Sequence, residues 1–220
     1  MFLRVICFLS LLFMPVPVMA GDIFDDIYGA NLYDINKDET KILFVTKMCT
    51  ADIIKGSFKD FSGQIYFDRG EPENSWVDVT IDASSLWLDH EYHKDELLTD
   101  IILGEQILKA GVFPKIRLKS TKIEVTSIHT GIMTADMTLV GETHPITLEV
   151  TFENAMTDRY ATTVDTDKVA FSAYGTFKRS DWNILYALDR IGIRRMVDEV
   201  QILLTTKASL SPDQPSKKPQ

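Results

Sequence analysis

Late in the chain, the run Arg179–Trp182 brings together a cation, a hydroxyl, a carboxylate and an indole. An arginine is permanently charged, and its planar guanidinium can bind a phosphate or another polar head group through two parallel hydrogen bonds. The same guanidinium can instead act as a structural clamp, paired with Asp181 or Asp198. Trp182 either lines a pocket or plugs one end of the fold. Arg179, Asp181 and Trp182 are therefore candidate head-group contacts, with the structural alternative open.

Patterns typical of catalysis or metal binding do not occur in the sequence. It contains no G-x-S-x-G, no Walker loop, no C-x-x-C and no dinucleotide-binding fingerprint. His90 and His93 lie three residues apart, which is not the H-E-x-x-H spacing, and catalytic zinc needs three convergent ligands. We expect a solvated histidine cluster, no metal site and no required cofactor. For an enzyme, the polar groups available to a cavity would be His93, Cys49 and Asp181.

The first twenty residues predict a secretory signal peptide. A single charge, Arg4, precedes a nearly all-apolar stretch, and Val18-x-Ala20 supplies the small residues that a signal peptidase requires. A membrane anchor is the weaker alternative, because a spanning helix needs roughly 20 apolar residues. We expect cleavage after Ala20 and a periplasmic or secreted protein. Cleavage would remove Cys7 and leave Cys49 alone, most simply as a small buried hydrophobe, with a reactive or pairing thiol as the alternative.

The overall composition is that of an ordinary globular protein. Of the 220 residues, 45% are hydrophobic and 25% are charged, which suits one domain and excludes a disordered or collagen-like chain. Lys and Arg total 23 against 32 Asp and Glu, a net charge of −9. Nucleic acids and anionic lipid surfaces both require clustered cations, so neither is expected as a partner. Beyond the first twenty residues, no stretch is apolar enough to predict a transmembrane segment.

Most of the chain after residue 30 alternates between apolar and polar residues, as half-buried strands do. In Trp76–Asp82, for example, Val77, Val79 and Ile81 share one face. The expected strands are Leu32–Ile35, Lys41–Lys47, Ile53–Phe58, Gln64–Phe67, Trp76–Asp82, Lys115–Ser120, Lys122–Ile128, Ile132–Val140, Ile146–Glu153, Val169–Phe177 and Met196–Ala208.

One segment, residues 93–110, has helical spacing instead. Gly104 divides it into two expected short helices, and Gly111 and Pro114 end the second. Its apolar face predicts either a movable cap over one end of the fold or a fixed plug. The apolar positions are Leu97, Leu98, Ile101, Ile102, Ile107 and Leu108.

Many sequential strands joined by short turns favour an all-β, antiparallel closed barrel, because closure leaves no free edge. We assign residues 21–30 to a lead-in and residues 31–208 to the barrel. Residues 209–220 are polar and Pro-rich, which predicts a disordered tail.

A barrel of about eight strands holds either packed side chains or one small ligand. The sequence does not separate these cases, since a filled core and a cavity wall are both apolar. The residues predicted to point inward and to line a cavity, if one exists, are Phe44, Phe58, Phe67, Val79, Ile81, Leu118, Leu139, Leu148, Phe171 and Phe177.

Six short motifs, taken in order, resemble those of the YceI-like family between about Leu32 and Ala208. The chain departs from the family pattern at Asn183, where Gly is usual, at Leu118, where Phe is usual, and near residues 95–99. The motifs are Tyr33-Asp34 with Ile42-x-Phe44-x-Thr46, Gly56-x-Phe58-x-x-Phe61-x-Gly63, Asp78–Leu86, Phe113–Thr121, Met137–Ile146, and Phe177–Trp182 followed by Val197–Val200.

The resemblance implies a lipocalin-like barrel that binds a long isoprenoid lipid, such as a polyprenyl phosphate or a quinone, in the periplasm. The protein would carry or store this lipid and exchange it with a membrane-bound donor or acceptor. Self-association into a homodimer is left open. The alternatives are an enzyme acting on an apolar substrate in the same cavity, and an envelope stress or structural protein with a filled barrel.

Overall fold

A computed structural model describes residues 29–47, 53–89, 96–153, 167–189 and 195–214. Several predictions fall outside these residues: the signal peptide and its cleavage site, and the states of Cys49, His90 and His93. The side chain of Glu96 is likewise not described.

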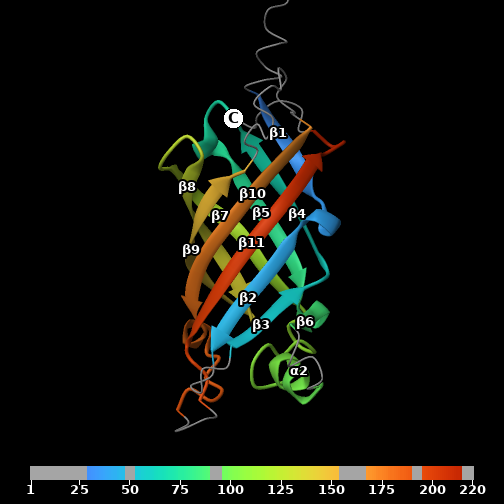
Figure 1. Cartoon of the computed structure of the whole chain (residues 1–220), viewed down its shortest axis with the longest axis vertical. Coiled ribbons are helices and arrows are strands. Elements are labelled where there is room, and N and C mark those ends of the chain that lie inside the picture. The colour runs from blue at the N-terminus through green and yellow to red at the C-terminus, as the bar shows by residue number, and fades with distance from the viewer. Residues whose placement is uncertain (1–28, 48–52, 90–95, 154–166, 190–194, 215–220) are drawn as a thin grey trace, which may run out of the picture.

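The described part of the chain forms one antiparallel sheet of eleven strands with a single α-helix (Figure 1). Along the sheet the order is β1-β4-β5-β7-β8-β9-β10-β11-β2-β3-β6. The strands are β1 Ala30–Ile35, β2 Lys41–Lys47, β3 Ile53–Phe58, β4 Phe61–Asp68, β5 Trp76–Asp82, β6 Leu86–Leu88, β7 Lys115–Val125, β8 Thr130–Leu139, β9 Glu142–Phe152, β10 Lys168–Lys178 and β11 Glu199–Leu210.

The first strand closes the sheet into a barrel. Tyr33 of β1 lies opposite Ile65 of β4 on one side and opposite Leu210 of β11 on the other. The closed ring therefore runs β1-β4-β5-β7-β8-β9-β10-β11 and back to β1. This is the predicted closed antiparallel barrel, and every strand in the ring has a neighbour on both sides.

Below β1, the strand β2 takes over as the neighbour of β11, and β3 and β6 extend the wall further. The chain bends at the passages between the upper strands β1, β4 and β5 and the lower strands β2, β3 and β6. Short 3-10 turns, η1 Lys37–Glu39 and η3 Ala83–Ser85, separate β1 from β2 and β5 from β6, and two residues separate β3 from β4.

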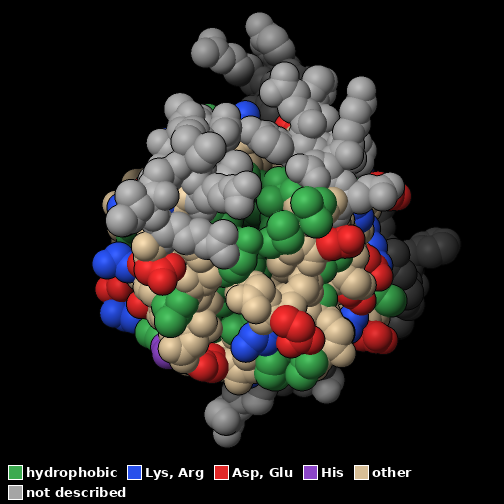
Figure 2. All heavy atoms as spheres, turned by 90° about the horizontal axis from the view of Figure 1, so that it is seen from below, with side chains coloured by type: hydrophobic (Ala, Val, Ile, Leu, Met, Phe, Trp, Pro, Cys, Tyr) green, Lys and Arg blue, Asp and Glu red, His purple; other side chains and the backbone are tan. Residues whose placement is uncertain are grey.

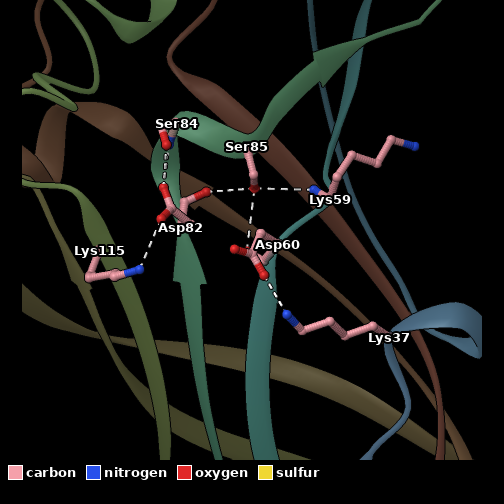
Figure 3. Close-up of polar contacts among 7 residues, drawn as sticks. All are labelled: Lys37, Lys59, Asp60, Asp82, Ser84, Ser85 and Lys115. Atoms are coloured by element: carbon pink, nitrogen blue, oxygen red, sulfur yellow. Dashed lines mark hydrogen bonds and ion pairs between the residues drawn. The ribbon is translucent and has the colours of Figure 1, made fainter.

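These bends are held together by polar contacts across neighbouring strands (Figure 3). Lys37 forms an ion pair with Asp60, and the Asp60 carbonyl accepts a hydrogen bond from the Asp82 amide at 2.9 Å. Ser85 Oγ donates to the Asp82 carbonyl at 2.7 Å, while Lys115 Nζ lies 2.9 Å from Asp82 Oδ2. The barrel wall is thus clamped at the level where its strands change direction.

The predicted helical insertion is only partly helical. The helix α2 spans Glu96–Leu103, but the second predicted helix is wrong, because the following residues form turns. The Leu108 amide donates back to the Ile102 carbonyl, and the Ala110 amide to the Leu103 carbonyl, both at 2.9 Å. The chain therefore folds back on the last turn of α2, and Lys109 adopts a φ of 47° to do so.

Two connections between the predicted strands are shorter in the structure than in the sequence prediction. The segments predicted as separate strands around Thr121 are one strand, β7, with a register shift between Ser120 and Lys122. The turn between β8 and β9 consists only of Val140 and Gly141, whose φ values are 46° and 83°. Positive φ at both positions matches the twist of an antiparallel hairpin, so the turn needs no further residues.

The end of the described chain is also ordered beyond the predicted boundary. β11 continues to Leu210, and the Gln214 side chain binds both backbone groups of Leu32, donating at 2.8 Å and accepting at 3.0 Å. Residues 209–214 therefore belong to the barrel, and the rest of the predicted tail lies outside the described residues.

Candidate functional site

Two apolar cavities lie in the barrel, one toward each end. The upper end is the end where β1 begins and β11 finishes, and the lower end carries α2 (Figure 1). The upper cavity has a volume of about 160 Å³ and the lower cavity a volume of about 140 Å³. Ile42, Leu118 and Leu204 line both of them, so the cavities meet at these three side chains, which we call the waist. The interior is therefore not completely filled, and it holds two apolar chambers that share part of their walls.

Strand periodicity explains how one strand serves both chambers. Successive inward residues lie two positions apart, so they step along the barrel axis. On β5, Val79 lines the upper cavity and Ile81 the lower one, and on β8 Met133 and Met137 divide in the same way. All four are buried.

Three phenylalanines form the wall of the upper cavity. The ring centroids of Phe67 and Phe152 are 5.1 Å apart, and Phe171 lies 5.2 Å from each of them. Toward the upper mouth, the lining becomes polar. The polar residues there come from the β7–β8 hairpin and from the residues around η2 Pro72–Asn74, and they are Ser75, Ser127, His129 and Thr130.

The lower cavity is apolar and closed by segments outside the barrel strands. Phe44 and Phe58 contact each other on its wall, with centroids 6.0 Å apart. Ile102 of α2 and Ile107 of the turns that follow it are buried against the cavity. The helical insertion thus packs over the lower mouth, as both the cap and the plug interpretations require.

The structure places most of the predicted lining residues at the cavities. Phe67, Val79 and Phe171 line the upper chamber, and Leu118 lies at the waist. Leu148 is fully buried in the core but is not one of the lining residues. The lower chamber takes the others: Phe44, Phe58, Ile81, Leu139 and Phe177.

Arg179 is buried at the lower end, where it lines the lower cavity, as predicted for a ligand contact, and also ties backbone segments together. Its side chain is only 4% exposed and donates from Nε to the Val197 carbonyl at 3.0 Å, from Nη1 to the Ile184 carbonyl at 2.9 Å and from Nη2 to the Met196 carbonyl at 3.4 Å. Burial lowers the pKa of Arg179, while the negative charge of Asp198 acts in the opposite direction. The guanidinium thus ties the end of β10 to the chain that leads into β11.

The two residues near Arg179 in sequence do not reach the cavities. Asp181 is exposed, and the carboxylate that serves this corner is Asp198, which accepts from the Ser180 amide at 2.9 Å and from its hydroxyl at 2.7 Å. Trp182 is 1% exposed and donates from Nε1 to the carbonyls of Met137 and Glu142. Trp182 therefore has the geometry of the alternative in which it plugs the barrel end.

Sequence reasoning missed several lining residues that share one signal. The inward face of β8 reads Met133, Ala135, Met137 and Leu139 at every second position, and only Leu139 was selected. Phe152 was also missed, although it completes the aromatic cluster with Phe67 and Phe171. The alternation that predicts the strands would have found both sets.

Several charged side chains form ion pairs on the outer surface of the barrel, whereas Arg179 is buried and lines the lower cavity. Arg117 binds Asp78 with both arms, at 3.0 Å from Nε and 2.6 Å from Nη2, which holds the pKa of Asp78 below its usual value. Seen from below, the molecule shows hydrophobic side chains toward the middle and charged ones mostly toward the margin (Figure 2). Large exposed apolar residues on the lower segments are Leu97, Val112 and Leu185.

A third hollow of about 430 Å³ lies against the wall formed by β2, β3 and β6. Its lining is mixed and includes Lys37, Lys41, Lys55 and Lys59, and Lys59 Nζ stands 4.5 Å from the centre of the Trp87 ring. This composition is typical of a solvated surface groove and differs from that of the two apolar chambers.

Nothing in the described part of the chain assembles a metal centre, since no three His, Cys, Asp or Glu side chains come together there. Of the three polar groups considered for catalysis, Asp181 is exposed and does not line a cavity. Cys49 and His93 are outside the described residues.

The fold and its interior define a class: a small, closed, antiparallel β-barrel of the lipocalin type, which encloses two apolar chambers. Residues 33–208 match the YceI-like domain, and the chain belongs to that family. Among the described residues, no helix combines the length and the apolar character that crossing a bilayer requires.

Comparison with known proteins agrees with this assignment. A UPF0312 protein of Pseudomonas putida strain W619 is 30% identical over 131 residues, covering 60% of this chain and 64% of that protein. The Campylobacter jejuni YCEI protein superposes with a TM-score of 0.58 at 25% identity, over 71% of this chain and 84% of its own.

Two more distant structures share the fold. Burkholderia cenocepacia BcnA superposes with a TM-score of 0.65 at 23% identity, over 80% of this chain and 99% of its own. A polyisoprenoid binding domain from Saccharophagus degradans has a TM-score of 0.57 at 10% identity, over 81% and 98%.

Proposed function

We propose that this protein binds one long isoprenoid lipid, such as a polyprenyl phosphate or a quinone, inside the barrel. The observation that carries the proposal is the pair of apolar chambers that meet at Ile42, Leu118 and Leu204. The hydrogen-bonding groups of a compact polar ligand would remain unpaired in these apolar chambers, whereas a long hydrocarbon chain has no such groups.

The energetics suit a chain-like ligand. Each methylene-sized group moved from water to an apolar environment contributes about 0.8 kcal/mol. A few isoprene units would therefore suffice for tight binding, and a polar head would mainly determine which way the lipid points. The domain name of the Saccharophagus degradans neighbour, a polyisoprenoid binding domain, supports the same ligand class for this fold.

The proposal includes a role as a binding protein of the periplasm, which carries or stores the lipid between membrane-bound partners. The predicted signal peptide supports export, and membership of a family of binding proteins supports a role without catalysis. The cavities favour this role over a filled structural barrel, because packed side chains would leave no room for a ligand.

Native mass spectrometry of the exported protein, followed by solvent extraction and identification of the extract, tests the proposal. We expect one isoprenoid lipid per chain, recovered chemically unchanged. A protein that purifies without ligand and keeps the same mass after incubation with polyprenyl phosphates and quinones would contradict it. Recovery of a chemically altered lipid would favour the enzyme alternative.

A further inference from the structure

Arg69 lies at the upper end of the barrel, directly after β4. Inward residues alternate along this strand, with Ile65 and Phe67 both lining the upper cavity. Arg69 follows the end of β4, two residues beyond Phe67, and although it does not itself line the cavity, its guanidinium lies over the Phe67 ring, which does. Pro72 and Ser75, from the turn that follows, line the upper cavity as well.

The guanidinium of Arg69 lies beside two aromatic rings and is incompletely hydrogen-bonded. Its central carbon is 5.5 Å from the centre of the Phe67 ring and 5.7 Å from that of Tyr33. Nη1 donates to the Tyr33 hydroxyl at 2.7 Å. Nη2, in contrast, is buried and has no hydrogen-bond partner among the residues that the structure describes. A charged donor that is buried without an acceptor is costly, which makes this atom an unfilled anion contact.

The neighbouring acids do not neutralise this cation. Asp68 Oδ1 accepts hydrogen bonds from the amides of Gly70 and Glu71, at 3.1 Å and 2.9 Å, and is thereby held within the turn. Glu71 Oε2 accepts from the Asn74 side chain. No carboxylate in the described part of the chain forms an ion pair with Arg69.

We propose that Arg69 binds the anionic head group, a phosphate or a carboxylate, of an amphiphile whose chain occupies the upper cavity. This inference rests on the proposed lipid-binding function and specifies its polar end. The Phe67 ring contacts the guanidinium on one side and lines the apolar cavity on the other, so head and chain would meet at this ring. Tyr33 is a positioning residue, because its hydroxyl holds Nη1.

The assignment fixes the direction of the lipid. Arg179, at the opposite end, already donates to three backbone carbonyls, whereas Arg69 keeps a donor unused. A lipid would therefore enter with its head at the upper mouth and extend its chain past the waist toward the lower cavity.

A matched pair of ligands tests the role of Arg69. Farnesyl phosphate and farnesol differ only in the anionic head, and their dissociation constants can be compared for the delipidated wild type and Arg69→Gln. A charge-assisted hydrogen bond of about 1.4 kcal/mol corresponds to a tenfold change in affinity. We expect Arg69→Gln to weaken farnesyl phosphate about tenfold or more and to leave farnesol within about twofold.

Three further measurements separate this role from others. Tyr33→Phe keeps the cation but frees Nη1, and we expect a smaller loss that is again confined to farnesyl phosphate. Lys122→Gln removes an exposed cation from the outer face of β7 and is expected to change neither ligand. Urea unfolding of each variant establishes that it is folded.

Several outcomes would overturn the inference. Equal losses for farnesol and farnesyl phosphate in Arg69→Gln would assign Arg69 a structural role only. Inorganic phosphate that binds as tightly as farnesyl phosphate, and through Arg69, would replace the lipid head group by a free anion. If neither farnesol nor farnesyl phosphate bound the wild type, the proposed function would fail together with this inference. Tight farnesol binding with no effect of Arg69→Gln on farnesyl phosphate would remove Arg69 alone.

Discussion

The Arg179 guanidinium donates a hydrogen bond to the Ile184 carbonyl at 2.9 Å, and this contact links the end of β10 to the residues that follow it. Two further carbonyls, of Val197 and Met196, accept from the same side chain. This fork with three backbone acceptors joins the residues after β10 to those before β11, and Ile184 and Met196, one from each segment, line the lower cavity.

Replacement of Arg179 by Met should therefore destabilise the barrel. Three buried carbonyls would lose a charged donor, and we expect a loss of about 2–4 kcal/mol in the free energy of unfolding, measured with urea on the delipidated protein. Arg179→Lys should recover only part of it, because an ammonium cannot form the planar fork. Farnesol and farnesyl phosphate should be weakened equally. A selective loss of the phosphate would instead support the head-group role expected from the sequence.

The waist can be blocked by one substitution. Leu118 lines both chambers, so Leu118→Trp should separate them and lower the affinity for long chains much more than for short ones. Lys119→Trp is the matched control, because the next residue on β7 points outward and is exposed. Binding of isoprenoids of increasing length to both variants gives the answer. Equal affinity of wild type and Leu118→Trp for every length would mean that no ligand crosses the waist.

A substitution of Trp182 can distinguish whether this side chain only fills the barrel end or also contacts the ligand. Its Nε1 donates to two backbone carbonyls, and its ring packs edge-on against Phe177 and His144. Trp182→Phe keeps most of the packing but removes the donor, so we expect a loss of about 1–3 kcal/mol in the free energy of unfolding. The stoichiometry of bound lipid should not change. Loss of the lipid from a stably folded Trp182→Phe variant would show that the indole contacts the ligand.

The polar contacts around Asp82 should stabilise the folded protein more at neutral pH than at acidic pH (Figure 3). Hydrogen bonds from Ser84 and the ion pair with Lys115 lower the pKa of Asp82 to about 2. A lowered carboxyl pKa stabilises the fold above the ordinary value of about 3.9, and this stabilisation is lost as the pH falls toward 2. Asp82→Asn should therefore melt below the wild type at pH 6, and the two should converge between pH 4 and pH 2.

Thermal melts at several pH values provide this comparison. Ser84→Ala, which removes one of the hydroxyl contacts, should show an intermediate pH dependence. If the difference in melting temperature between wild type and Asp82→Asn stayed constant over the whole acidic range, the contacts around Asp82 would play no part in the pH dependence of stability.

The sequence was sufficient to predict most of the strands, many of their inward residues and the closed barrel, although it missed β6 and divided β7 in two. Alternation is local, so residues such as Val79, Ile81 and Phe171 could be assigned to the interior before any contact was known. The ordered motifs also led to the correct family. The helix after Gly104 was mispredicted because backbone bonds back to α2, which apolar spacing does not encode, determine that segment.

Whether the interior is hollow, and which groups surround the two arginines, became known only from the tertiary structure. A filled core and a tunnel wall use the same apolar residues, and only the packing of eight strands around a common axis leaves the two chambers and their waist. The partners of Arg179 are backbone carbonyls, which every residue carries and which therefore leave no trace in the sequence. Arg69 became a candidate only because the fold places its guanidinium over Phe67 and leaves one buried nitrogen without a hydrogen-bond partner among the described residues.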